Sequence, residues 1–307
     1  MRHLLTLEGV YLSRSWITIG SFDGVHLGHQ AIVHQLVSGA REAGAPTVVL
    51  TFHPHPAVVL NKRNHPYYLT VPEERAALLG ELGVDYVVTH PFNAEIAAMT
   101  ARQFVQYLHE HFKFERLVVG YNFALGKGRE GDLRMLISLG EEIGYSVQAV
   151  EPITNGDIVI SSSQIRQLLF EGDVERASRL LGRPYRLSGV VVPGDARGRL
   201  IGIPTANLDL QYDRALPKVG VYACLAVFHG ETYPAVVNVG YRPTFDTDPM
   251  QPRVEAHLLD FTGELYSKHL SVDFVRRLRD EQKFASVEAL VSQIHQDIAS
   301  ARMIFGQ

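Results

Sequence analysis

The fold of the first half of this chain is decided by Trp16-Ile17-Thr18-Ile19-Gly20-Ser21-Phe22-Asp23-Gly24-Val25-His26-Leu27-Gly28-His29. The first four residues are aromatic or β-branched, which is typical of a buried strand. Apolar residues then recur at helical spacing from Ile32 to Ala43. A strand, a glycine-rich turn and a helix start bring free backbone N–H groups and the positive end of a helix dipole together. The stretch therefore predicts an anion site.

His26 and His29 stand at the expected helix entrance, where both could donate N–H bonds to phosphate oxygens. Two alternatives exist: surface histidines without a role, and a metal site, because His-x-x-His can chelate. Asp23 is the only carboxylate close to them in sequence and no cysteine lies nearby, which disfavours a zinc shell. The strand–turn–helix context favours phosphate binding.

The rest of the first half alternates short apolar runs with helical patterns, which predicts a parallel sheet flanked by helices. The expected strands, each buried on both faces, are residues 16–19, 47–52, 86–89, 117–119 and 146–150. The expected helices after the first are residues 72–82, 100–112 and 132–143. Ligands of such sheets bind at the carboxyl ends of the strands. Two segments lie at such ends: residues 20–29 with His26 and His29, hereafter the histidine turn, and the loop at 120–128. The glycine spacing of that loop departs from a P-loop.

The pattern changes at Leu181-Gly182-Arg183-Pro184. Beyond it short strands recur between clusters of Gly, Pro and Asp, which predicts a small β-barrel or sandwich. The expected strands are residues 187–192, 221–228, 235–239, 254–261 and 270–275, followed by a helix at 286–304. We therefore expect one domain over residues 1–183 and a second over 184–307.

Two features of the second half suggest chemistry. Gly202-Ile203-Pro204-Thr205-Ala206-Asn207 follows the glycine-rich and basic run at 194–199. The Thr205 hydroxyl and the Asn207 side-chain carbonyl are oxygen atoms of the kind that hard cations prefer, although such a sequence alone could be an ordinary turn. Glu255 lies in an apolar strand, as either a solvated outer-face residue or a base that lines the barrel.

Composition sets limits on the class of protein. The chain has 307 residues, enough for about two domains, and 46% hydrophobic with 20% charged residues is ordinary for a globular protein. A net charge of −4 gives no support for sequence-independent nucleic-acid binding, which would need a basic surface, although it leaves a local basic patch open. No apolar run approaches the ~18 residues of a membrane span and the start of the chain does not resemble a signal peptide. The single cysteine excludes an internal disulfide. We expect a cytoplasmic enzyme without a nucleic-acid or membrane partner.

Four stretches together resemble a known family. His26-Leu27-Gly28-His29 resembles the His-x-Gly-His signature of the nucleotidyltransferase superfamily. The others are Thr51-Phe52-His53-Pro54-His55-Pro56, Gly120-Tyr121-Asn122-Phe123-Ala124-Leu125-Gly126 and Ser161-Ser162-Ser163-Gln164-Ile165-Arg166. In this order they are similar to the N-terminal module of the prokaryotic bifunctional riboflavin kinase/FMN adenylyltransferase (FAD synthetase) family. The C-terminal motifs resemble the kinase module of the same family, so the resemblance covers nearly the whole chain.

The resemblance implies a Rossmann-like α/β nucleotidyltransferase domain followed by a small, mainly-β flavokinase barrel with a C-terminal helix. It implies that ATP and Mg²⁺ convert riboflavin to FMN, and that a second ATP converts FMN to FAD and pyrophosphate. The alternatives are a monofunctional nucleotidyltransferase for another phosphorylated acceptor, a chain that keeps one of the two activities, and a non-catalytic flavin-responsive binding protein. The oligomeric state stays open.

The resemblance also implies roles for individual residues. The catalytic residues would be Glu255, as the base of the kinase, with His26, His29 and Arg166 of the adenylyltransferase. Binding of ATP and its phosphates would involve Gly20, Phe22, Asp23, Gly24, Gly28, Asn122, Ser162, Ser163, Gly198, Arg199, Gly202 and Pro204. Flavin would be bound by Asn122 and Arg279, and the metal by Thr205 and Asn207. Asn122 departs from the family, in which an acidic residue is common there.

Overall fold

The chain divides into two units, Met1–Ser162 and Ser163–Gln307. The computed structural model describes residues 1–60, 68–156, 158–194, 198, 202–210, 213–242 and 251–306. This division falls earlier than the change of pattern at 183–184, because α7 (Ser162–Glu171) and α8 (Val174–Leu181) precede the barrel and α8 packs on two of its strands. A boundary at 183–184 stays a prediction about which fragment folds alone.

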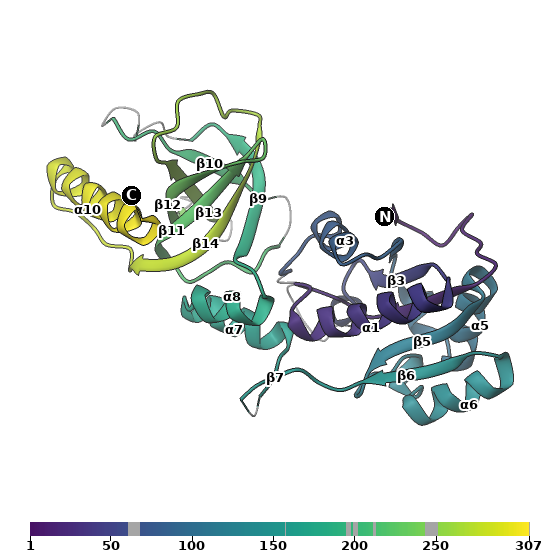
Figure 1. Cartoon of the computed structure of the whole chain (residues 1–307). Helices are drawn as coiled ribbons and strands as arrows, with labels where there is room; N and C mark the ends of the chain where they lie inside the picture. The colour runs from purple at the N-terminus through teal and green to yellow at the C-terminus, as the bar shows by residue number, and fades with distance from the viewer. Residues whose placement is uncertain are drawn as a thin grey trace. The chain divides into compact units, whose positions relative to one another are not determined.

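The first unit is built on a parallel sheet of six strands in the order β1-β4-β3-β2-β5-β6 (Figure 1). The strands are β1 (Arg2–Leu4), β2 (Ser15–Ile19), β3 (Thr47–Phe52), β4 (Tyr86–His90), β5 (Phe114–Gly120) and β6 (Ser146–Val150). From β2 the chain continues into β3 and β4 on one side and later adds β5 and β6 on the other. β2 and β5 thus flank the topological switch point, where open α/β sheets bind ligands.

Helices cover both faces of this sheet (Figure 1). One face carries α1 (Leu27–Ala43) and α3 (Pro72–Glu81), whose Val33, Leu36 and Leu79 are buried against it. The other carries α5 (Ala101–Phe112) and α6 (Leu133–Ile143). The expected α/β fold is confirmed. Short elements complete the unit: α2 (Pro56–Val59), α4 (Ala94–Ala98), the 3-10 turn η1 (Lys127–Arg129) and the hairpin of β7 (Thr154–Asn155) and β8 (Ile158–Val159).

One expectation about the sheet is wrong. The apolar run at 146–150 predicts a strand buried on both faces, but every residue of β6 is partly or fully exposed. β6 has a neighbour on one side only, β5, because it is an edge strand of the sheet. Position in the sheet decides burial here, and an apolar run does not encode that position.

The second unit contains a closed barrel in the order β10-β13-β12-β11-β14-β9, with every pair antiparallel. The strands are β9 (Tyr185–Val192), β10 (Ala206–Asp209), β11 (Gly220–Phe228), β12 (Glu231–Arg242), β13 (Gln251–Leu258) and β14 (His269–Arg279). The barrel is therefore confirmed over the alternative of a sandwich. The closing helix α10 (Val287–Phe305) packs on β11 and β12 through Ala301 and Ile298.

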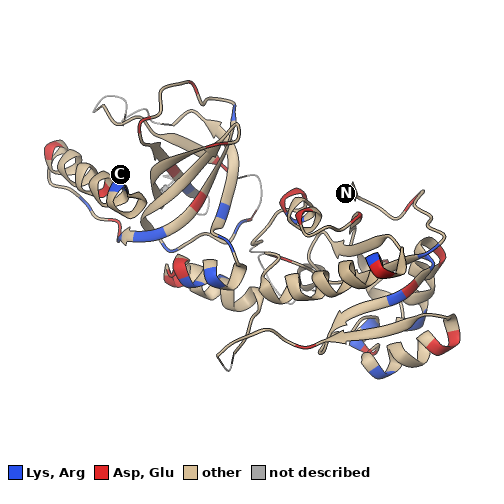
Figure 2. Cartoon of the chain, in the orientation of Figure 1, with Lys and Arg blue, Asp and Glu red and all other residues tan. Residues whose placement is uncertain are grey.

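Charges are mixed in both units. Figure 2 shows Lys and Arg interspersed with Asp and Glu along the drawn helices and strands. This distribution fits the small net charge of −4. Within the described residues, no helix is long and apolar enough to cross a membrane.

Candidate active sites

The turn after β2 is held in an unusual backbone conformation. Phe22, Gly24 and Val25 have φ angles of 46°, 85° and 41°. Left-handed backbone is rare for a β-branched residue such as Val25 and costs about 1–3 kcal/mol. Phe22 is buried, and its ring centroid lies 5.1 Å from that of His29. A Cβ at Gly20 would lie 3.0 Å from the Phe22 ring, so glycine there leaves space for this ring.

His26 and His29 form a stacked pair at the start of α1. Their ring centroids are 3.6 Å apart and their planes differ by 19°. His26 Nδ1 accepts the backbone N–H of His29 at 3.3 Å, so a neutral His26 ring carries its proton on Nε2. A Cβ at Gly28 would lie 3.2 Å from the His26 ring, so glycine lets this ring fold over the helix start. The two histidines meet as the sequence predicts.

The pKa of His29 is held well below its ordinary value of 6.5. Burial is the largest cause, followed by the charges of His26 and Arg75. Its Nδ1 is buried and has no partner among the described residues. A neutral ring at pH 7 donates from one nitrogen only, whereas nearby phosphate charge favours the protonated ring.

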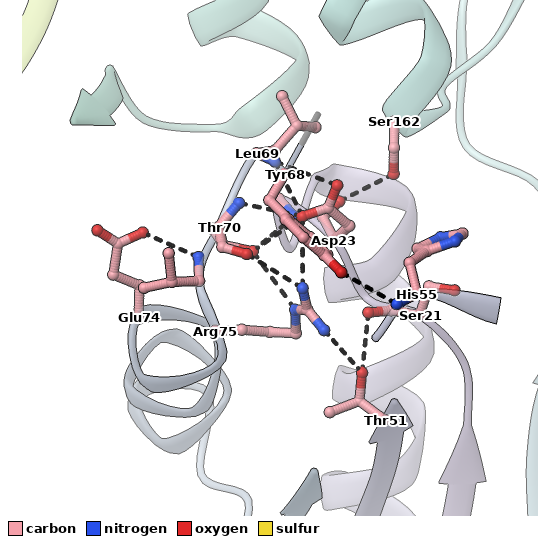
Figure 3. A network of polar contacts seen from close by, with 12 residues as sticks. Ser21, Asp23, Thr51, His55, Tyr68, Leu69, Thr70, Glu74, Arg75 and Ser162 are labelled. Carbon is pink, nitrogen blue, oxygen red and sulfur yellow. Dashed lines mark hydrogen bonds and ion pairs between the residues drawn. The ribbon is translucent and has the colours of Figure 1, made fainter. Parts of the chain in front are cut away.

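The Asp23 carboxylate is bound by residues 69–75. Its carboxylate accepts the backbone N–H groups of Leu69 at 3.0 Å and Thr70 at 3.0 Å, and pairs with Arg75 at 3.5 Å (Figure 3). No cluster of three His, Cys, Asp or Glu that could hold a metal occurs within the described ranges. Asp23 thus connects the turn after β2 to Leu69, Thr70 and Arg75.

The other predicted nucleotide residues divide between the two units. Asn122 is exposed just after β5, the neighbour of β2, and its carbonyl accepts a bond from Arg129 at 3.2 Å. The Ser162 hydroxyl, at the end of the first unit, donates to the carbonyl of Asp23 at 2.8 Å (Figure 3). Ser163 and Arg166 belong to the second unit, where Arg166 is buried on α7. Their role in nucleotide binding stays a prediction.

A second polar cluster lies on neighbouring strands of the barrel. Glu255 on β13 stands directly opposite Asn207 on β10 and Asn238 on β12. Val254, Ala256 and Leu258 form the buried face of β13, so Glu255 lies on the outer face and does not line the barrel. The sequence left open a solvated outer-face residue and a base that lines the barrel. The outer face is correct, but Glu255 is only 23% exposed there and is thus not solvated as expected.

Arg253 connects the members of this cluster. Its guanidinium forms an ion pair with Glu255 and donates from Nε to Asn207 Oδ1 at 3.0 Å. Both partners of the ion pair are about three-quarters buried, at 27% and 23% side-chain exposure. The Glu255 carboxylate and the Asn207 amide oxygen are thus held in one place by the same guanidinium. Their roles as base and metal ligand stay predictions.

Two glycines let the chain close around Asn207 and Thr205. A Cβ at Gly194 would lie 2.2 Å from Asn207 Nδ2, and one at Gly198 would lie 2.3 Å from the carbonyl oxygen of Ile203 and 3.5 Å from Thr205 Oγ1. Gly202 takes a φ of 76°, which favours glycine. The Pro204 carbonyl accepts from His257 Nδ1 at 2.7 Å. Arg199 lies outside the described residues, so its predicted contact with phosphate stays a prediction.

Arg279 has a protein partner that the sequence does not reveal. It pairs with Asp297 of α10 through Nε and Nη2, at 2.9 Å and 2.8 Å, and Asp297 is 4% exposed. This forked, partly buried pair attaches α10 to the end of β14. Flavin binding by Arg279 stays a prediction. Arg279 would have to bind flavin while it is paired with Asp297.

Sequence reasoning assigned no role to three residues of these sites. Arg253 could have been found, because alternation along a strand places it on the face of Glu255. Arg75 also left a signal, since it is a charged residue one turn before Leu79, on the apolar side of a predicted helix. Asn238 left none, because only strand register brings it opposite Glu255.

Both units match known families. Residues 10–164 match the FAD synthetase family model, and residues 181–305 match the riboflavin kinase family model. The fold and the two clusters thus define a two-part flavin-nucleotide enzyme: a nucleotidyltransferase-type α/β unit followed by a flavokinase barrel.

Curated relatives span both units. The chain is 38% identical over 296 residues to the bifunctional riboflavin kinase/FMN adenylyltransferase of Bacillus subtilis (strain 168), covering 95% of this chain and 93% of the relative. It is 40% identical over 288 residues to the protein of the same name from Pseudomonas fluorescens, covering 94% and 92%. The chain belongs to the bifunctional riboflavin kinase/FMN adenylyltransferase family.

A solved structure is similar over the full length. The crystal structure of a macrolide-efflux protein from Streptococcus pneumoniae superposes with a TM-score of 0.89 at 31% identity and covers 98% of each chain. Both units of this chain therefore occur together in a solved protein.

Proposed function

We propose that the two units catalyse consecutive steps of FAD synthesis in the cytoplasm, and that the residues above divide the work between them. The observation that carries this proposal is the pairing of two separate polar sites with the two family matches: the histidine turn in residues 10–164 and the Asn207–Glu255 cluster in residues 181–305. A monofunctional nucleotidyltransferase would leave the second cluster without a role.

In the second unit Glu255 accepts the proton of the riboflavin 5′-hydroxyl as that oxygen attacks the γ-phosphorus of ATP and ADP leaves. General-base assistance of this kind contributes about 10²–10⁴ in rate. Arg253 holds the Glu255 carboxylate in place. The donor oxygens of Asn207 and Thr205, together with the cradle at Gly194, fit a hard cation. When bound, Mg²⁺ would be held by these two residues and would neutralise phosphate charge.

In the first unit a phosphate oxygen of FMN attacks the α-phosphorus of a second ATP, and pyrophosphate leaves. His26 donates from Nε2 and His29 from its free ring N–H to the phosphate oxygens, so the developing charge meets fixed donors. The backbone N–H groups at the start of α1 add to this field. Positioning and charge neutralisation suffice for such transfers, and no protein nucleophile takes part.

One assay tests the proposal. Purified protein is incubated with riboflavin, ATP and Mg²⁺, and the flavins are separated by chromatography. FMN and FAD should both form, and supplied FMN should be converted to FAD without riboflavin. Formation of FAD from FMN without any phosphorylation of riboflavin would assign one activity only. Flavin binding with neither product would favour a non-catalytic flavin-responsive protein.

A further inference from the structure

Arg75 contacts Asp23 of the histidine turn and has no role in the proposed phosphoryl or adenylyl transfer. It is 0% exposed and sits in the first turn of α3. Buried arginines are rare and occur with partners. Figure 3 draws its contacts with Asp23, Thr51 and Thr70, and each of these three residues leads back to the turn that follows β2. Arg75 Nη1 also lies 3.5 Å from the Phe52 carbonyl oxygen.

The first link runs through Thr51 on β3. Arg75 Nη1 donates to Thr51 Oγ1 at 3.1 Å, and the same hydroxyl donates to the Ser21 carbonyl at 2.9 Å. The second link is direct, from Arg75 Nη2 to Asp23 Oδ1 at 3.5 Å. Two points of the turn, Ser21 and Asp23, are thus attached to one guanidinium.

The third link runs through Thr70. Arg75 Nη2 donates to the Thr70 carbonyl at 3.1 Å, and Thr70 Oγ1 accepts the backbone N–H of Gly24 at 3.0 Å. Thr70 and Leu69 also donate their backbone N–H groups to Asp23. Arg75 therefore holds the strand-side and helix-side ends of the turn at once, over the stretch where Phe22, Gly24 and Val25 are left-handed.

We propose that Arg75 is a positioning residue for adenylyl transfer, which holds the turn at 21–25 in the conformation that presents His26 and His29 to the nucleotide phosphates. Phe22 transmits this position to His29, because their rings are in contact. The planar fork of arginine can bridge several acceptors at fixed angles, whereas a lysine ammonium acts as a single point charge. This inference rests on the proposed adenylyltransferase function of the histidine turn.

The test compares Arg75→Met and Arg75→Lys with wild type and with Arg102→Met, a control that removes an arginine from an exposed ion pair of the same unit. Misplacement of catalytic groups by about 1 Å costs about 10²-fold in rate. We expect kcat for FAD formation from FMN to fall by about 10²-fold in Arg75→Met, with a smaller change in the KM for ATP. Arg75→Lys should recover part of this loss and Arg102→Met should lose nothing. Riboflavin phosphorylation by the second unit gives an internal control and should be unchanged in all three.

A second readout follows His29 directly. Arg75 and His26 are the charged or titratable neighbours that lower the pKa of His29 besides burial. Loss of the guanidinium charge should raise this pKa in Arg75→Met, while Arg75→Lys should keep it low, as measured by NMR titration of the imidazole. A His29 pKa that stays at its wild-type value in folded Arg75→Met would mean that the guanidinium does not act on this imidazole, and would overturn the proposal.

A variant without an unpaired charge separates positioning from folding. Arg75→Met leaves the Asp23 carboxylate buried without its arginine, which destabilises the fold. The double variant Asp23→Asn/Arg75→Met removes both charges and keeps an oxygen for the N–H groups of Leu69 and Thr70. It should fold and still form FAD about 10²-fold more slowly. Wild-type FAD formation by this folded double variant would overturn the proposal. Absence of FAD formation by the wild-type protein would instead reject the adenylyltransferase function itself.

Discussion

Replacement of Gly194 by alanine should move one side chain of the kinase site while leaving the barrel intact. The new Cβ would lie 2.2 Å from Asn207 Nδ2, whereas ordinary contacts begin at 3.4 Å, so the amide has to retreat by about 1 Å. The clash is with the end of a side chain, and Gly194 does not have a left-handed φ, so rotation of Asn207 relieves it. The melting temperature should therefore change little.

The same displacement takes Asn207 Oδ1 away from Arg253 and from the proposed metal position. A shift of this size costs about 10²-fold, so kcat/KM for riboflavin phosphorylation should fall by about that factor while FAD formation from FMN is unchanged. Chromatography of both reactions and a Mg²⁺ titration measure the effect, which should include a higher Mg²⁺ requirement. Gly263→Ala, whose Cβ meets the ring end of Phe261, is the control in the same unit. A stable Gly194→Ala protein with wild-type kinase activity and Mg²⁺ dependence would refute the assignment of Asn207.

Four further outcomes are expected. Glu255→Gln keeps the shape of the side chain and removes the base, so riboflavin phosphorylation should fall about 10²-fold or more, and kinase turnover within a few-fold of wild type would show that Glu255 is not the base. His29→Ala should stop the pathway at FMN, with FAD formation reduced by about 10²–10³, and undiminished FAD would assign His29 a structural role. The pKa values of His29, His53 and His90 are lowered in the folded protein, so the unfolded chain binds more protons near pH 6. The first unit should therefore lose stability as pH falls below the ordinary histidine pKa of 6.5. Denaturant titrations that show equal stability at pH 7.5 and 5.5 would contradict this. A fragment of residues 184–307 should fold and phosphorylate riboflavin without making FAD. A longer fragment of residues 163–307 should be more stable, because Val174, Ala177 and Leu180 of α8 are buried. If the longer fragment folded but lacked kinase activity, the kinase would need the first unit.

The sequence predicted the elements with strong local patterns. The strand at 47–52 and the helix at 132–143 match β3 and α6, the latter with Asp132 as its N-cap. Thr100 likewise caps α5, and Ser286 caps α10. These boundaries could be predicted because apolar periodicity and capping side chains act within a few residues of each other.

Features that depend on distant pairing escaped prediction. β1 and β10 have three and four residues and carry little pattern of their own. The opposition of Asn207, Glu255 and Asn238 follows from register between three strands, which no local spacing encodes. For the same reason no local pattern pairs Asp23 with Leu69, Thr70 and Arg75, which the fold brings to its carboxylate. A part of Asp23 in phosphate binding stays a prediction.

The barrel is closed by β10, a strand of four residues that pairs with β13 on one side and β9 on the other. If β10 detached, the ring would open into a sheet whose two new edges, β9 and β13, expose unpaired backbone groups. Such edges can pair with another molecule of the same chain and start aggregation. Asn207 lies on β10, so a ligand bound to it also opposes this opening by mass action. On the proposed function, Mg²⁺ and ATP bound at Asn207 would protect the barrel from this opening, and their withdrawal would favour self-association.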